Sequence, residues 1–181
     1  MCNSFNKKFL DEAAKALEQQ GEEATVDHSQ FMNKAVEKAI QGVLSNDGGP
    51  FGCIIVKDGK IIGSGNNRVT STNDPTAHAE VLAIREACSK LNSFQLDECI
   101  LYTSCEPCPM CFGAIYWARP KKVFYGCNKN DAANIGFDDD FIYKELDLDL
   151  IKRSIPFKQI DRKNAMKAFK AWEDKDDKIE Y

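Results

Sequence analysis

The chain contains a strand–helix–strand segment, which constrains the fold more than any other feature. Glu98–Thr103 has the apolar pattern of a short buried strand, Cys108–Ala118 that of an apolar helix, and Lys122–Gly126 that of another strand. Strands that follow one another in this order, with a helix between them, form a parallel crossover. The segment therefore predicts an α/β fold in which part of the sheet is parallel.

The other segments supply further helices and strands in an order that fits three layers. Apolar residues recur at helical spacing in three stretches, namely Phe31–Val43, Ala79–Leu91 and Lys163–Trp172. Asp58-Gly59 separates the apolar runs Cys53–Val56 and Ile61–Gly63, which is typical of a β-hairpin. Ser154–Ile160 is predicted as a last strand. We expect a three-layer α/β/α sandwich with a central five-stranded mixed sheet.

Length and charge set the domain organisation. A chain of 181 residues fits one compact domain, and we expect that domain at 28–181, after a polar extension of unknown role at 1–27. The net charge of −4 comes from the ends, because 1–27 and 173–181 each contribute −3 and the middle carries +2. This charge argues only weakly against nucleic acid. With no secretory signal and no apolar run of membrane length, we expect a cytoplasmic protein.

Two short motifs carry candidate metal ligands. His78 and Glu80 stand at the predicted start of one helix, and Cys108 and Cys111 occupy the first turn of another. Side chains of a first turn reach beyond the helix end, and the positive end of the helix favours a thiolate. Two helix starts that face each other would place one imidazole and two thiolates around one zinc ion, with a fourth position open to water.

Glu80 then has the position of a base that does not bind the metal. Zinc lowers the pKa of a bound water to about 7, and a neighbouring carboxylate can take up its proton. Two structural alternatives remain. An iron–sulfur pattern would need a cysteine at position 115, where Ile115 stands, and a closed zinc site would use Cys105 as a fourth ligand.

The paired motifs resemble those of the cytidine deaminase-like zinc hydrolases, whose signature is His-x-Glu followed by Pro-Cys-x-x-Cys. Within that superfamily, the chain is similar to the small bacterial-type guanine deaminases over about residues 29–181. The resemblance is carried by Gly48–Gly52, Asn73–Glu80, Thr103–Cys111, Ala114–Pro120, Gly136–Asp139 and Glu180-Tyr181.

The resemblance implies a role for individual residues. His78, Cys108 and Cys111 would hold one zinc ion per subunit, and Glu80 would be the catalytic proton carrier. Asp139 would bind the substrate and share in proton transfer. A carboxylate only accepts hydrogen bonds, which suits the N1–H and exocyclic amine of guanine and not the N1 acceptor of adenine. Without the resemblance, 138–140 would read as a solvated acidic turn.

Five further residues would line the substrate site, namely Asn67, Phe51, Ala79, Trp117 and Tyr181. Asn67 would hydrogen-bond the purine, although its neighbour Asn66 leaves an error of one position open. Phe51 would stack on the ring or, equally well, pack in the core. Tyr181 would reach the site of the partner subunit in a homodimer whose C-terminal segments, 161–181, are exchanged.

The activity that the resemblance implies is the hydrolytic deamination of guanine to xanthine and ammonia. Three alternatives stay open. Guanosine deamination shares the zinc motif, adenosine deamination in tRNA would need a basic surface and a flipped base, and a non-catalytic zinc protein would need a fully ligated metal. Nucleic acid is the less favoured partner because basic pairs such as Lys121-Lys122 are too few.

Overall fold

A computed structural model describes residues 27–180, so the predicted extension lies outside the described residues except for Asp27, and so does Tyr181. The described elements include four short helical ones that the sequence did not predict, namely α3 (Val69–Thr72), α6 (Lys129–Asn134), α7 (Asp140–Leu146) and the 3-10 helix η1 (Leu150–Lys152). Within residues 27–180, no helix has the length and apolar character needed to cross a membrane.

The sheet is mixed and has the strand order β2-β1-β3-β4. β1 (Gly52–Lys57) and β2 (Lys60–Asn66) form the predicted antiparallel hairpin, with Asp58 and Gly59 at positive φ in the turn. β3 (Ile100–Cys105) runs antiparallel to β1, and β4 (Lys122–Cys127) runs parallel to β3. The parallel crossover predicted from the strand–helix–strand segment is therefore confirmed.

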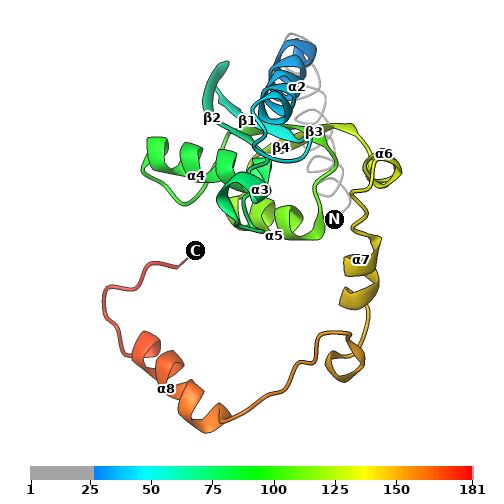
Figure 1. Ribbon diagram of the computed structural model, residues 1–181. Helices are drawn as coiled ribbons and strands as arrows, with labels where there is room; N and C mark the ends of the chain where they lie inside the picture. The colour runs from blue at the N-terminus through cyan, green and yellow to red at the C-terminus, as the bar shows by residue number, and fades with distance from the viewer. Residues whose placement is uncertain (1–26, 181) are drawn as a thin grey trace, which may run out of the picture.

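Helices cover both faces of this sheet (Figure 1). α2 (His28–Leu44) packs on one face, where Ala35 joins Ile54 and Tyr102 in a buried cluster. α4 (Ala79–Leu91) and α5 (Pro109–Ala118) cover the other face around a second core that includes Ile55. The three-layer α/β/α arrangement is thus present, and it brings the starts of α4 and α5 to one side of the sheet.

The approach of α2 to the sheet depends on a glycine. A Cβ atom on Gly52 would lie 2.2 Å from the carbonyl oxygen of Ala35 and 2.4 Å from the backbone nitrogen of Ala39. These are backbone atoms, which cannot move aside as a flexible side chain can. A side chain at position 52 would therefore push α2 away from the start of β1.

The expected fifth strand is not confirmed, because the sheet within residues 27–180 has four strands and Ser154–Ile160 contains no strand residue. A strand forms by pairing with a neighbour, and Figure 1 shows this stretch on an arm that leads away from the sheet. Pro156 also lacks the N–H that a ladder would use. The predicted last helix does form, as α8 (Arg162–Glu173).

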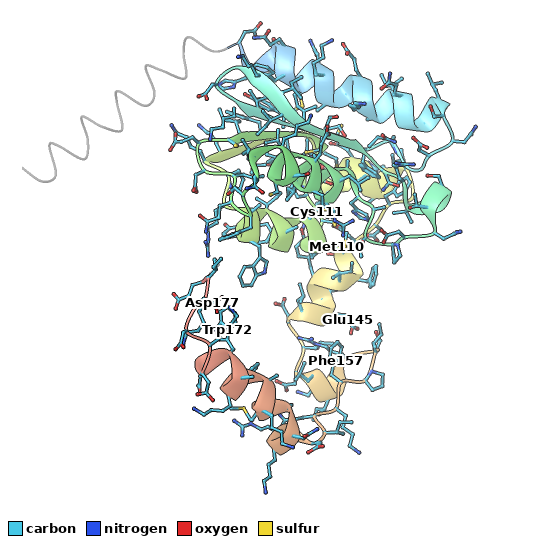
Figure 2. All side chains as sticks on the ribbon, turned by 90° about the vertical axis from the view of Figure 1, so that its left-hand side faces the viewer. Met110, Cys111, Glu145, Phe157, Trp172 and Asp177 are labelled. Carbon is cyan, nitrogen blue, oxygen red and sulfur yellow. The ribbon has the colours of Figure 1, made fainter. Side chains whose placement is uncertain are left out.

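We call residues 140–180 the C-terminal arm. It leaves the body at α7 and carries α8 at a distance from the sheet, as Figures 1 and 2 show. Every residue from 154 to 180 is exposed. The exposed side chains include many large apolar ones, among them Leu150, Ile151, Ile155, Phe157, Ile160, Phe169 and Trp172. From residue 154 onward, the arm therefore has the composition of a packed segment that the body of its own chain does not cover.

Candidate functional site

Two helices begin at the predicted metal-binding motifs. His78 and Cys108 are the N-cap residues of α4 and α5, and both have an extended backbone conformation. Glu80 is the second residue of α4, and Cys111 is the third of α5. Pro109 occupies the first position of α5, where its missing N–H costs no helical hydrogen bond. Both motifs thus project side chains beyond a helix start.

The imidazole and the two sulfur atoms meet at one point. The Nδ1 atom of His78 lies 3.5 Å from the Sγ atom of Cys108 and 3.5 Å from that of Cys111. All three donor atoms lie within 4.8 Å of one another. In a tetrahedral zinc site, bonds of about 2.3 Å to sulfur and about 2.0 Å to nitrogen separate these donors by about 3.5 Å. The cluster therefore fits a zinc ion bound by three protein ligands.

The neighbours of the two thiols shift their pKa values in opposite directions. The pKa of Cys108 falls to about 4, because its thiolate accepts a hydrogen bond from Cys111 and another from His78. The same interaction raises the pKa of Cys111, and burial adds to the effect. The Cys108 thiolate also raises the pKa of His78. A metal cation in this cluster would replace the protons that the three residues share.

Glu80 lies beside the cluster and is 5% exposed. Its Oε1 atom accepts a hydrogen bond of 3.0 Å from the Thr103 hydroxyl, and its Oε2 atom accepts one of 3.3 Å from the Cys111 thiol. Burial raises the pKa of the Glu80 carboxyl above its usual range, although both hydrogen bonds oppose the shift. A carboxyl group with a raised pKa next to an open metal position suits a proton carrier.

Cys105 is close in sequence to the cluster but belongs to a different environment. It is the last residue of β3, and its thiol points to the carbonyl oxygen of Asn128 at 3.6 Å. Burial raises its pKa to about 11, which keeps the thiol protonated at neutral pH. The group of donors within ligand distance comprises His78, Cys108 and Cys111 only, among the residues that the structure describes. The closed four-ligand site is therefore not supported.

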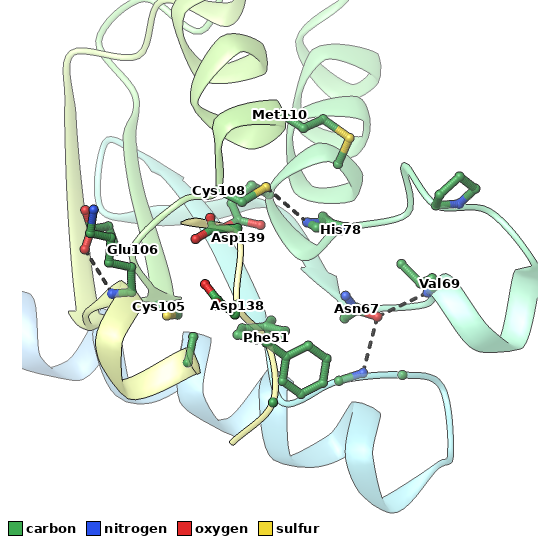
Figure 3. Close-up of a pocket in the computed structure, with 18 of the residues that line it drawn as sticks. Phe51, Asn67, Val69, His78, Cys105, Glu106, Cys108, Met110, Asp138 and Asp139 are labelled. Atoms are coloured by element: carbon green, nitrogen blue, oxygen red, sulfur yellow. Dashed lines mark hydrogen bonds between the residues drawn. The ribbon is translucent and has the colours of Figure 1, made fainter. Parts of the chain in front are cut away.

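A cavity of about 960 Å³ opens in front of the cluster, and Asn67 lines it (Figure 3). The Asn67 Oδ1 atom accepts hydrogen bonds from the backbone N–H groups of Gly49 and Val69, at 3.3 and 3.2 Å. Two N–H donors fix the oxygen end of the amide, so its NH₂ group is turned to other partners. Asn66 instead donates to the carboxylate of Asp47, at 2.9 Å, and does not line the cavity.

The side chains of Asp138 and Asp139 have different environments in the structure. Asp138 also lines the cavity, but its carboxylate is exposed and accepts the backbone N–H of Asp140 at 2.9 Å, which makes it part of a turn. Asp139 is the N-cap residue of α7, makes no side-chain capping bond and is half-buried. It lies beside Cys108 in the cavity wall (Figure 3). Burial and then the Cys108 thiolate raise its pKa. The solvated-turn interpretation fits Asp138 but not Asp139.

Phe51 was expected either to face the substrate space or to pack in the core, and in the structure it does both. It packs partly against the core cluster behind α4 and α5, and it also lines the cavity. Phe137 meets it edge to face, with ring centroids 4.9 Å apart and an interplanar angle of 88°. A Cβ atom on Gly49 would come within 3.0 Å of both rings. The two aromatic rings therefore form one fixed apolar wall of the cavity.

Two predicted substrate residues do not line the cavity, and a third is not described by the structure. Ala79 is fully buried in the core cluster and does not face the open space. Trp117 is 64% exposed and lines a separate groove between α4 and α5. The outward face of α5 is as apolar as its inward face. The pattern could not distinguish those two faces. Tyr181 lies outside the described residues.

Several cavity residues were not singled out from the sequence. Glu106, Met110, Lys129 and Phe137 line the space together with the predicted residues. The Glu106 carboxylate accepts the backbone N–H of Lys129 at 3.1 Å, and the Lys129 ammonium lies 4.8 Å from the ring centroid of Tyr143. These contacts connect β3 to α6 and α6 to α7. Glu106 and Met110 stand within the cysteine motif, and Phe137 stands within the Gly136–Asp139 stretch, but no periodicity marks Lys129.

Comparisons with known proteins agree with this geometry. Residues 25–127 match the family described as the cytidine and deoxycytidylate deaminase zinc-binding region. Guanine deaminase of Bacillus subtilis is 58% identical over 156 residues, which are 86% of this chain and 100% of the relative. Its X-ray structure superposes with a TM-score of 0.84 over 86% of this chain and 99% of that chain.

More distant relatives cover less of the chain. A guanine deaminase structure from Nitrosomonas europaea is 34% identical, with a TM-score of 0.58 over 60% of this chain and 63% of that chain. A tRNA-specific adenosine deaminase of Aquifex aeolicus is 51% identical over 76 residues, 42% of this chain and 50% of the relative. The chain belongs to the cytidine and deoxycytidylate deaminase family of zinc-binding domains.

Proposed function

We propose that this protein is a guanine deaminase, which hydrolyses guanine to xanthine and ammonia. One observation carries the proposal: the cavity that holds the His78, Cys108 and Cys111 donors is also lined by the Asp139 carboxylate and the Asn67 amide. The similarity to the Bacillus subtilis guanine deaminase over that relative's full length supports it.

The three donors would hold zinc, which supplies a Lewis acid that makes a bound water acidic enough to react near neutral pH. Glu80 is within reach of that position, because its Oε2 atom lies 3.3 Å from the Cys111 sulfur. As a buried carboxylate it would accept one proton from the attacking water and deliver it to the ring nitrogen N3. It would then carry the second proton, from the hydroxyl group added at C2, to the leaving amine as the C2–N bond breaks. The departing group is then ammonia.

Recognition of guanine would use an acceptor and a donor. The Asp139 carboxylate accepts hydrogen bonds, which matches the N1–H and amine of guanine, and its raised pKa reflects partial removal from water. The Asn67 NH₂ group would donate to an acceptor atom of the purine, since its oxygen is already used by the backbone. The Phe51 ring supplies an apolar face.

The structure bears on each of the alternative functions. Adenine has a hydrogen-bond acceptor at N1. This atom would face the acceptor oxygens of the Asp139 carboxylate, so neither group would have a hydrogen-bond partner. Guanosine would also fit the open cavity of about 960 Å³ in the single chain, so the volume does not separate the nucleoside from the base. A non-catalytic zinc site does not account for Glu80, a buried carboxylate outside the donor cluster.

The C-terminal arm supports a homodimer with exchanged segments. Residues 154–180 are exposed in the single chain, and Ile151, Ile155, Ile160 and Phe169 are each more than half exposed. Exposed apolar surface of this extent marks a protein–protein contact. A partner's segment 161–181, ending at Tyr181, would cover the body and narrow the open cavity. We retain the deaminase domain as 28–181 and the segment 1–27 as an extension of unassigned role.

A reducing compartment suits this chemistry. The seven cysteines among residues 27–180 are all free thiols, and two of them supply the metal donors. Thiols persist in the cytoplasm, where glutathione and thioredoxin keep them reduced. We therefore place the enzyme in the cytoplasm.

The test is a substrate panel. Zinc-loaded protein is incubated separately with guanine, guanosine, adenine, cytidine and tRNA, and ammonia release is measured. The proposal expects ammonia from guanine at a kcat/KM at least about 100-fold above that for any other substrate. A higher kcat/KM for guanosine would replace the proposal with the nucleoside activity, and ammonia from tRNA alone would reject both.

A further inference from the structure

Thr103 holds one oxygen of the Glu80 carboxylate. It lies on β3 with a side chain that is 1% exposed, and its hydroxyl donates to the Glu80 Oε1 atom at 3.0 Å. Thr103 does not line the cavity, so it does not face the substrate space. Thr103 could therefore influence the reaction only through its hydrogen bond to Glu80.

The other Glu80 oxygen has a different kind of neighbour. The Cys111 thiol donates to Oε2 at 3.3 Å, but a thiol that binds a metal has released its proton. Thr103 is then the side-chain donor that remains on the Glu80 carboxylate, among the contacts of residues 27–180. A hydroxyl has one proton to donate, so this donor engages one carboxylate oxygen only.

A purely structural role would not call for threonine at this place. On the same face of the sheet, Thr103 stands between Leu101 and Cys105 of β3, opposite Cys53 on β1 and Tyr125 on β4. Valine has nearly the same shape and brings no hydroxyl into the core, so it would suit a buried strand. The adjacent Ser104 has a structural use, since its oxygen accepts the backbone N–H of Gly52 at 3.0 Å.

We propose that Thr103 is a positioning residue for Glu80: it anchors Oε1 and thereby directs Oε2 toward the metal donors as the oxygen that exchanges protons. The inference rests on the proposed function, because it assigns the geometry of the same carboxylate. It predicts that the hydroxyl of residue 103, and not its methyl group, determines the rate of turnover.

The test compares two pairs of side chains that differ by the hydroxyl. The first pair is the wild type and Thr103→Val, which have nearly the same shape but differ by the hydroxyl. The second pair is Thr103→Ser and Thr103→Ala, which are smaller and also differ by the hydroxyl. In zinc-loaded protein, we expect each loss of the hydroxyl to lower kcat for guanine by about 10- to 100-fold. We expect KM to change less than about threefold, because Thr103 does not contact the substrate. Thr103→Ser should recover most of the wild-type kcat.

Zinc content and the melting temperature are measured on every variant, so that a loss of metal or of folding is separated from a loss of positioning. Thr72→Val is the matched control: its hydroxyl donates to the Arg68 carbonyl oxygen at 2.7 Å on an exposed helix, and its removal should leave kcat unchanged. If Thr103→Val fails to fold, the Ala–Ser pair decides alone.

Equal kcat values within either folded pair would overturn the positioning role. So would a fall in kcat that follows zinc loss in proportion, because Thr103 would then support the metal site and not the carboxylate. Failure of the proposed function gives a different result, since wild-type protein itself would then release no ammonia from guanine.

Discussion

The Nδ1 atom of His78 lies 3.5 Å from the sulfur of Cys108, although 30 residues separate the two in the chain. Each residue caps a different helix, and both helices pack on the same face of the sheet. The contact is therefore created by the order of strands and helices. It also brings Glu80 and Cys111, one turn deeper in the same helices, within 3.3 Å of each other.

Zinc retention should depend on Cys108 and not on the exposed Cys127. Cys108→Ser replaces a thiolate donor by a poor zinc ligand, so we expect zinc to fall from about one ion per chain to less than about 0.2. Guanine turnover should fall with it. Cys127→Ser serves as the control and should keep both. Metal analysis after dialysis measures the stoichiometry, and full retention by the Cys108 variant would contradict the ligand assignment.

Metal-free protein should contain one ionised thiol in the cluster at neutral pH. The pKa of Cys108 is lowered to about 4 and that of Cys111 is raised. The Cys108 thiolate is therefore present above about pH 4 and is lost as the pH falls through that value, while Cys111 stays protonated. Thiolate ultraviolet absorbance between pH 3 and pH 7 measures this titration. The step should vanish in Cys108→Ser, and a step that persists there would have another origin.

Asp139 and Asp138 should differ sharply in their effect on guanine turnover. Asp139→Asn replaces an acceptor-only group by one that offers donors to the donor edge of guanine, so kcat/KM should fall by about 10- to 100-fold. Asp138 also lines the cavity, but its exposed carboxylate is engaged by the Asp140 N–H in a turn, so Asp138→Asn should cost less than about threefold. Steady-state kinetics at matched zinc content compares them, and equal effects would return both residues to a solvated acidic turn.

Deletion of residues 174–181 should impair turnover and leave the zinc site intact. Residues 174–180 are exposed and do not contact the metal donors of their own chain, so zinc content should stay near one ion per chain. If the partner's segment closes the cavity, KM for guanine should rise by about tenfold or more. Light scattering on the full chain should give a dimer mass. Unchanged kinetics would assign the segment no part in the site.

The order of the secondary structure could be predicted wherever the apolar pattern faces the core. α4 spans the predicted Ala79–Leu91 because its inward residues repeat at helical spacing and contact the sheet. The helix starts at His78 and Cys108 followed from the motifs themselves. Ser154–Ile160 has a strand-like composition but no neighbouring strand, and pairing is a property of the whole fold that a local pattern does not contain.

The side-chain roles were only partly predictable. Asn67 could be separated from Asn66 only by the structure, because one amide faces the cavity and its neighbour binds Asp47. Trp117 lies on the outer face of a helix that is apolar on both faces, so its direction had no signal. Thr103 begins the Thr103–Cys111 stretch that carries the resemblance, but it lies in a buried strand and nothing in the pattern assigned its hydroxyl a role.

The most direct test of the catalytic account is guanine turnover by Glu80→Gln at equal zinc content. Glutamine keeps the size of the side chain and its hydrogen bond from Thr103 but cannot accept the proton, so we expect one zinc ion per chain and a kcat at least about 1,000-fold below wild type. A kcat within tenfold of wild type, or loss of zinc from the variant, would contradict the assignment of Glu80 as the proton carrier outside the metal site.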